Sequence, residues 1–169
     1  MKTKHIFLFS VTIITLLAYA CQKEDAGNSI LKIRMTDAPT ALEEVNIDLQ
    51  QVNIKFEKDS GGWVSMQTNA GIYNLLNFQN WVDTLIAHGS YPQGDVKEIR
   101  LVLGNNNSVK ESGQVYPLVI PSGSESGLKI KINKKLRTGL DSLLIDFDAL
   151  MSIKKERDNY KLRQVIRLR

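Results

Sequence analysis

Residues 45–56 of the chain read VNIDLQQVNIKF, and their two alternating runs decide the fold. Apolar and polar residues alternate in 45–49 and again in 52–56, which is the period of a strand with one face in a core. Gln50 and Gln51 add one residue too many for a single phase. We expect a β-bulge at this point, because a bulge returns the apolar residues of both runs to the same face.

The flanking sequence predicts more short strands, separated by clusters of Gly, Pro, Asn and Ser. The expected strands cover residues 30–35, 63–66, 72–76, 99–103, 115–120, 128–132, 143–149 and 160–168. Many short strands at near-regular spacing are typical of an all-β sandwich or an open barrel. Residues 78–86 break this pattern, because their apolar side chains have helical spacing. We therefore expect one short helix there, with Trp81 on its buried face and Gly89 at its end.

The N-terminal residues have the composition of an export signal. A basic start, residues 1–5, precedes an apolar stretch, residues 6–20, which is shorter than the roughly 20 residues that a membrane-spanning helix needs. Small residues stand before Cys21, the only cysteine of the chain. This arrangement resembles the lipobox of bacterial lipoproteins. We expect residues 1–20 to be a signal peptide and Cys21 to carry a lipid.

A polar segment, residues 21–29, separates this signal from a domain that we place at residues 30–169. Its composition predicts a flexible tether. Lys23, Glu24 and Asp25 resemble the lipoprotein export signal of Bacteroidota. The resemblance implies a lipid-anchored protein of the outer membrane that faces the cell surface, with a periplasmic orientation as the alternative.

The charge balance argues against a nucleic-acid partner. The chain has 22 basic and 18 acidic residues, a net charge of +4, and loss of Lys2 and Lys4 with the signal lowers it to +2. The late lysines alternate with apolar residues in 128–132, as they do on the solvent face of a strand. A nucleic-acid surface needs a basic stripe with interleaved aromatic residues, and we see none.

Eight short stretches, in order, resemble a family of exported bacterial lipoproteins, domain of unknown function 4382. They are Met35-Thr36-Asp37-Ala38-Pro39, Glu44-Val45, Trp63 after its glycine turn, Leu75-Leu76, Tyr91-Pro92-Gln93-Gly94 before Ile99-Arg100-Leu101, Val119-Ile120-Pro121-Ser122-Gly123, Asp146-Phe147-Asp148-Ala149 with Ser152-Ile153, and Tyr160-Lys161-Leu162 near Val165-Ile166-Arg167. The resemblance covers about residues 31–167. It implies an immunoglobulin-like or transthyretin-like sandwich and no established activity.

Three acidic residues of these stretches, Asp37, Asp146 and Asp148, are the candidates for chemistry. Asp146 and Asp148 are two apart, so on a strand they share a face and can offer oxygens to Ca²⁺, which needs six or more. Paired carboxylates also suggest a metal-dependent or glycoside hydrolase. The simpler interpretation, which we favour, is that these residues cap turns and face water. His88 stands alone after the signal, so we expect no zinc site. The sequence also lacks the Gly-x-Ser-x-Gly motif of serine hydrolases, and we expect no enzyme.

The aromatic residues give the other candidate site. Trp63, Trp81 and Tyr91 can stack on sugar rings if they are exposed together on one face, although packing in the core is the default expectation for both tryptophans. From the sequence we therefore expect a non-enzymatic adhesion, scaffold or ligand-binding module of the cell envelope, with a glycan or an envelope protein as its partner. A carbohydrate-binding module of a glycan-uptake system is the alternative.

Overall fold

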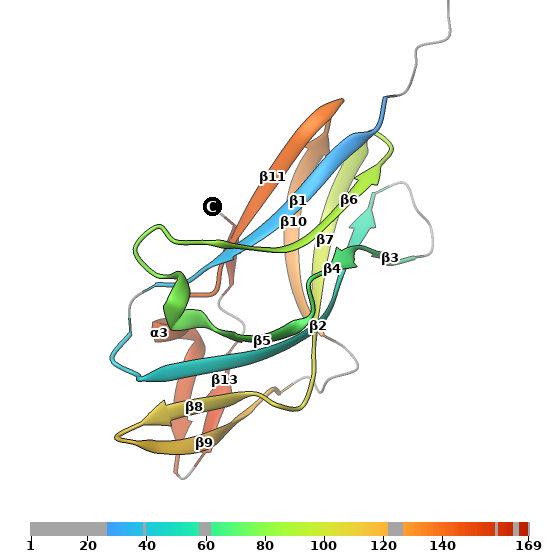
Figure 1. The fold of residues 1–169 in the computed structure, drawn as a ribbon. Helices are drawn as coiled ribbons and strands as arrows, with labels where there is room; N and C mark the ends of the chain where they lie inside the picture. The colour runs from blue at the N-terminus through green and yellow to red at the C-terminus, as the bar shows by residue number, and fades with distance from the viewer. Residues whose placement is uncertain are drawn as a thin grey trace, which may run out of the picture.

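The computed structural model describes residues 27–38, 40–57, 62–121, 127–157, 159–163 and 166–168. These residues form two β-sheets that pack face to face (Figure 1). The smaller sheet has five strands, in the order β14 (Arg167–Leu168), β11 (Gly139–Asp146), β1 (Ser29–Thr36), β6 (Thr84–Tyr91) and β4 (Gln67–Thr68). In its centre β1 pairs in parallel with β11 and antiparallel with β6.

The larger sheet has nine strands. Along its main path lie β10 (Leu128–Leu136), β7 (Gly94–Leu103), β2 (Glu44–Phe56), β8 (Ser108–Glu111), β9 (Gln114–Val119), β13 (Asn159–Leu162) and β12 (Ile153–Glu156). Two further strands, β3 (Val64–Ser65) and β5 (Gly71–Asn74), pair with β2. The segment that contains them also includes β4 of the smaller sheet, so it connects the two layers.

Strand β2 carries the deciding stretch of sequence, and it contains the expected bulge. Its register against β7 shifts between Leu49 and Gln51. On either side of the shift, Ile47, Leu49, Val52 and Ile54 are buried. The bulge therefore keeps both alternating runs in phase with one core, as the sequence predicts.

The core lies between the two sheets. Leu31, Ile33, Ile86 and Ile145 of the smaller sheet, and Ile54, Ile99, Leu101 and Leu136 of the larger one, are at least nine-tenths buried and belong to one cluster of apolar side chains. Residues two apart on a strand point to the same face, which explains why Leu31 and Ile33 are buried while Lys32 is partly exposed. The prediction of an all-β, sandwich-like domain is confirmed.

The predicted helix over residues 78–86 is wrong. Leu75–Phe78 form a 3-10 helix, η1, residues 79–83 form a loop, and strand β6 begins at Thr84. Asn80 and Trp81 have φ angles of 55° and 73°, which no α-helix contains. Pairing of β6 with β1 along its length outweighs the helical spacing of the apolar residues. Gly89 is needed for packing, because a Cβ there would meet the ring of Tyr91.

Two other expected elements end earlier than predicted. Strand β11 stops at Asp146, and Ala149–Ser152 form the short α-helix α3. The run at residues 160–168 divides into β13 and β14, which join different sheets. Within the described part of the chain, no helix is long and apolar enough to cross a membrane.

The loop between β7 and β8 provides the hydrogen-bond partner of β2 between the part that pairs with β7 and the part that pairs with β8. Asp48 N donates to Asn107 Oδ1 at 2.9 Å, and Asn107 Nδ2 donates to the carbonyl of Gly104 at 2.7 Å. Asn107 is 6% exposed. We expect Asn107→Ala to lower the free energy of unfolding by about 1–3 kcal/mol, because it leaves the buried Asp48 N–H without an acceptor.

The matched control is Asn105→Ala in the same loop, at an exposed position. Urea denaturation of both variants tests the prediction, and the control should stay within about 0.5 kcal/mol of the parent. Equal losses in the two variants would show that Asn107 Oδ1 does not hold this loop.

Candidate functional site

The three candidate aspartates lie together at one end of the smaller sheet. Asp146 ends β11 and is opposite Thr36, the last residue of β1, in the parallel register. Asp37 follows β1, and Asp148 precedes α3. Asp37 is 5% exposed, Asp146 is 3% exposed and Asp148 is 9% exposed. The expectation that these acids face water is therefore wrong, because the ends of β1 and β11 are covered by neighbouring segments.

Each of the three carboxylates accepts a hydrogen bond from the backbone between β11 and β12. Ala149 N donates to Asp37 Oδ1 at 2.7 Å, and Asp148 N donates to Asp146 Oδ1 at 3.2 Å. Asp148 caps α3, since Met151 N donates to its Oδ1 at 3.2 Å. Asp148 itself has a φ of 43°, a left-handed conformation that aspartate tolerates better than most residues. The predicted capping role is confirmed by these contacts.

Thr36 extends this arrangement to the segment before β6. Its Oγ1 lies 2.8 Å from the carbonyl oxygen of Phe78 and 2.9 Å from that of Val82. Asp37 N donates to the same Phe78 carbonyl at 3.0 Å, and Phe147 N donates to the carbonyl of Thr36 at 3.1 Å. We call Thr36, Asp37, Asp146 and Asp148 the Asp37 network. It joins the ends of β1 and β11 to η1 and α3.

The geometry of the Asp37 network is that of a structural site. Within the ranges that the structure describes, no group of three or more His, Cys, Asp or Glu residues is arranged to hold a metal ion. A Ca²⁺ site needs six or more oxygens that are open to the ion, whereas the carboxylates here already accept backbone N–H groups. A calcium or hydrolase role for Asp37, Asp146 and Asp148 stays a prediction that these contacts do not favour.

Burial changes the acidity of Asp37. Loss of solvent raises the pKa of its carboxyl group, and the nearby Asp146 carboxylate raises it further. Hydrogen bonds from Ala149 N and from Gln79 oppose this effect without cancelling it. Burial therefore disfavours the charged form of the Asp37 carboxyl group, although the same group accepts the hydrogen bond from Ala149 N.

The three candidate aromatic residues do not share one face. Tyr91 is 8% exposed and its ring packs on that of Phe56, with 6.2 Å between centroids. The guanidinium carbon of Arg100 lies 4.7 Å from the centre of the Trp63 ring. Trp81 is 88% exposed, and it is separated from Tyr91 by the length of β6, about 25 Å. Trp63, Trp81 and Tyr91 therefore do not form a flat, exposed platform for a sugar.

Trp81 stands at the tip of a loop that is fixed at both sides. Val82 N donates to the carbonyl of Gln79 at 3.1 Å, and Gln79 Nε2 donates to that of Ala38 at 3.3 Å. Arg34 Nε forms an ion pair with Asp83. We call residues 79–83 the Trp81 loop. This loop holds the exposed Trp81 side chain on a backbone that hydrogen bonds fix. The prediction that Trp81 lies on the buried face of a helix is wrong.

Other exposed apolar side chains lie on segments that the Asp37 network joins. Val82 is 51% exposed, and on α3 Leu150 and Met151 are 63% and 53% exposed. Helix α3 and η1 lie at the same end of the domain (Figure 1). This end therefore presents Trp81 together with aliphatic side chains.

One apolar depression of the described surface, lined by Phe56, Val64, Tyr91 and Pro92 among others, has a volume of about 220 Å³. Ligand pockets for drug-sized molecules have about 300–1,000 Å³. A larger, open depression of about 630 Å³ lies over Asp48, where the Asp48 carboxylate accepts hydrogen bonds from Asn106 and holds the loop after β7.

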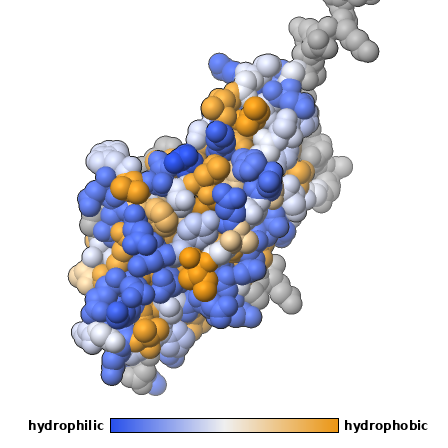
Figure 2. Space-filling model, viewed as in Figure 1, coloured by the Kyte–Doolittle hydropathy of each residue, from blue (hydrophilic) through white to orange (hydrophobic). Residues whose placement is uncertain are grey.

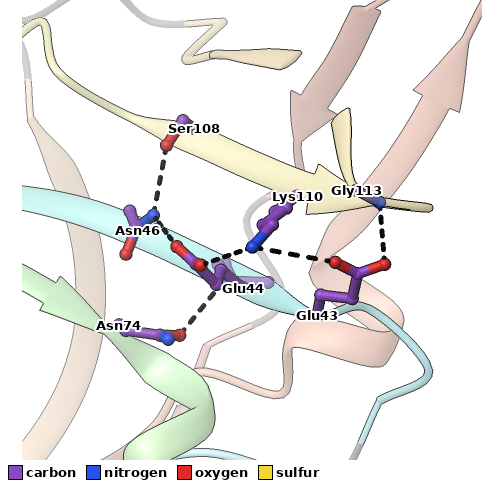
Figure 3. Close-up of polar contacts among 8 residues, drawn as sticks. Glu43, Glu44, Asn46, Asn74, Ser108, Lys110 and Gly113 are labelled. Atoms are coloured by element: carbon purple, nitrogen blue, oxygen red, sulfur yellow. Dashed lines mark hydrogen bonds and ion pairs between the residues drawn. The ribbon is translucent and has the colours of Figure 1, made fainter. Parts of the chain in front are cut away.

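A second polar network lies on the outer face of the larger sheet (Figure 3). Lys110 Nζ is 3.3 Å from Glu44 and 3.9 Å from Glu43, and Asn46 Nδ2 donates to both Glu44 and Ser108. Hydrogen bonds from Asn46 and Lys110 lower the pKa of Glu44. Since exposed ion pairs contribute little, we interpret this network as one that aligns β2 with β8.

The opposite pKa directions of two aspartates predict opposite pH dependences. The folded pKa of Asp37 is raised, so the folded state binds more protons and the stability of the parent rises relative to Asp37→Asn as the pH falls through this raised pKa toward the ordinary value of about 4. The pKa of Asp141 is lowered, chiefly by Lys134, so the stability that its charge contributes is lost as the pH falls below about 4. Asp141→Asn is therefore the matched control.

Urea denaturation at several pH values compares the two variants with the parent chain. The unfolding free energy of the parent minus that of Asp37→Asn should increase toward acid pH. The unfolding free energy of the parent minus that of Asp141→Asn should decrease toward acid pH. Parallel pH profiles for all three proteins would contradict the burial of a charged Asp37.

Comparisons with known proteins agree with the resemblance seen in the sequence. Residues 28–163 match the family described as Domain of unknown function (DUF4382). Comparisons with curated proteins and with solved structures give no match. Cys21, the predicted lipidation site, lies outside the described residues. The family match spans most of the chain and the whole of the sandwich up to β13, so the chain belongs to the DUF4382 family.

Proposed function

We propose that this protein is a non-enzymatic binding module of the bacterial cell envelope, anchored by a lipid on Cys21, whose contact surface is centred on the Trp81 loop. One observation carries the binding role: Trp81 is 88% exposed and has a φ of 73°. A left-handed backbone costs a residue with a Cβ about 1–2 kcal/mol, and an exposed tryptophan forgoes the free energy of burial. Such strain is typically found at functional sites.

The surroundings of Trp81 support a contact surface. The loop is held by Thr36 through the carbonyls of Phe78 and Val82, so its side chain is presented without a large loss of conformational entropy on binding. Tryptophan is among the residues that contribute most at protein interfaces. The exposed Leu150 and Met151 of α3 add aliphatic surface at the same end of the domain.

The aspartates support a role without catalysis. A catalytic acid must reach the substrate, whereas Asp37, Asp146 and Asp148 are buried and accept backbone N–H groups. A carbohydrate partner remains the second candidate, because one exposed indole ring can stack on a sugar ring. Trp81 is the residue of the predicted aromatic set that supports it.

The direction of β1 supports an outward-facing contact surface. The chain enters the domain at Ser29, and the Asp37 network lies at the other end of β1, about 25 Å away. If Cys21 is held at a membrane, the Trp81 loop lies at the end of β1 that is farther along the chain from that anchor. The Lys23-Glu24-Asp25 stretch supports the cell surface as the location.

Two substitutions at Trp81 separate binding from strain. We expect Trp81→Ala and Trp81→Gly both to abolish binding to a glycan or envelope-protein ligand found in a screen of the chain from residue 21 onward. Trp81→Gly should also be more stable than Trp81→Ala by about 1 kcal/mol, because glycine adopts φ of 73° without a Cβ clash. Ligand titration and urea denaturation measure the two effects.

Val115→Ala is the control for binding, since Val115 is 68% exposed on β9, in the larger sheet. A ligand that binds the parent and both Trp81 variants equally would refute the Trp81 loop as the contact surface. Equal stability of the glycine and alanine variants would refute the strain.

The anchor is tested by Cys21→Ser. A diacylglyceryl group on a cysteine holds a protein firmly on a membrane, whereas serine has no sulfur to form the thioether that carries this group. We expect the parent to pellet with envelopes after cell fractionation and the variant to lose most of that signal, and radiolabelled palmitate should enter only the parent. Labelling of the serine variant, or of neither protein, would remove the lipid from the proposal.

A further inference from the structure

Two aliphatic side chains are exposed where the chain enters the domain. Ile30 of β1 and Leu140 of β11 are opposite each other in the parallel register, and they are 49% and 64% exposed. Both point to the outer face of the smaller sheet, away from the buried Leu31. Hydrophobic surface is visible near the upper end of the domain in Figure 2, where β1 and β11 begin in Figure 1.

Two cations flank this aliphatic pair. Lys32 is on the same face of β1 as Ile30, two residues further along, and Arg137 is exposed in the turn between β10 and β11. Neither forms an ion pair with another residue of the described ranges. The acid of this region, Asp141, is already bound by Lys134 at 2.7 Å and by the backbone N–H of Arg137. We call Ile30, Lys32, Arg137 and Leu140 the basal surface.

The position of the basal surface in the chain limits its distance from Cys21. Ile30 is nine positions after Cys21, and nine residue steps span at most about 30 Å when the chain is fully extended. A lipid on Cys21 would therefore keep the basal surface close to the headgroups of the bilayer. Exposed aliphatic residues next to Lys and Arg are the combination that binds the interface of an anionic membrane.

We propose that the basal surface docks on the surface of the membrane that holds the lipid anchor. Ile30 and Leu140 enter the boundary between headgroups and acyl chains, and Lys32 and Arg137 pair with phosphate groups of anionic lipids. This inference rests on the lipid anchor of the proposed function. It deepens that function, because a docked domain has a fixed orientation in which the Trp81 loop faces outward.

The test uses the chain from residue 21 onward with Cys21→Ser, so that no acyl chain contributes. The protein is sedimented with large vesicles of phosphatidylglycerol and phosphatidylcholine, and separately with pure phosphatidylcholine vesicles. We expect measurable partitioning onto the anionic vesicles that weakens with added salt. Lys32→Gln and Arg137→Gln should each lower the partition coefficient about 5-fold, and the double variant Ile30→Ser, Leu140→Ser should lower it about 10-fold.

Matched controls come from the far end of the larger sheet. Lys154→Gln and Arg157→Gln remove exposed cations of β12 and of the turn after it, and Val115→Ser with Val119→Ser removes exposed aliphatic residues of β9. These controls should bind as the parent does. Equal losses in controls and basal variants, or no binding of the parent to either kind of vesicle, would overturn the proposal.

Sedimentation velocity without lipid tests the alternative that a second copy of the chain covers the basal surface. A dimer that the Ile30→Ser, Leu140→Ser variant disrupts would also overturn membrane docking. The outcome is separable from that of the anchor, because vesicle binding is measured without acylation. If palmitate does not label the parent, the lipid anchor is refuted but the vesicle-binding result is unaffected. If the protein does not bind vesicles, membrane docking is refuted but the lipid anchor is unaffected.

Discussion

The hydrogen bond from Ala149 N to the buried Asp37 carboxylate, 2.7 Å long, is the contact on which one whole end of the domain depends. A buried carboxylate is costly unless hydrogen bonds satisfy it, so the backbone around Ala149 has to remain in place. Thr36 and Asp37 are consecutive, and they reach η1 on one side and α3 on the other. Two residues at the end of β1 thus hold two segments, η1 and α3, that are distant from each other in the sequence.

The same constraint explains why an unfavourable backbone persists at Trp81. Strained φ angles survive only where the surroundings determine the conformation, and here the carbonyls on both sides of Asn80 and Trp81 lie at Thr36 Oγ1. The raised pKa of Asp37 and the left-handed Trp81 are therefore two costs of one arrangement. A fold selected for stability alone would have little reason to combine a buried charge with an exposed indole, which is why we assign the contact role to this end.

The strands could be predicted from the sequence, and the site mostly could not. Alternation in residues 45–56 gives β2 and its bulge, because one face of that strand is buried along its length. Residues 78–86 were misassigned because Phe78, Trp81, Val82 and Ile86 belong to three different elements, and only pairing with β1 reveals this. The stretch of Asp146 and Asp148 marks the right segment, but it pairs and bonds with Thr36 and Asp37, which are more than a hundred residues away in the sequence.

The two ends of β1 differ in chemistry, and this difference gives the domain a direction. At Ser29 the smaller sheet carries Ile30 and Leu140 beside Lys32 and Arg137, a combination that suits a charged lipid surface. At Thr36 it carries a rigid loop with an uncharged aromatic tip, which suits a folded partner or a sugar ring. A single strand, β1, connects the two ends, so docking of one end on a surface is enough to orient the other. An anchor on a flexible chain alone would leave the Trp81 loop free to face the membrane, whereas docking of the first end excludes that orientation.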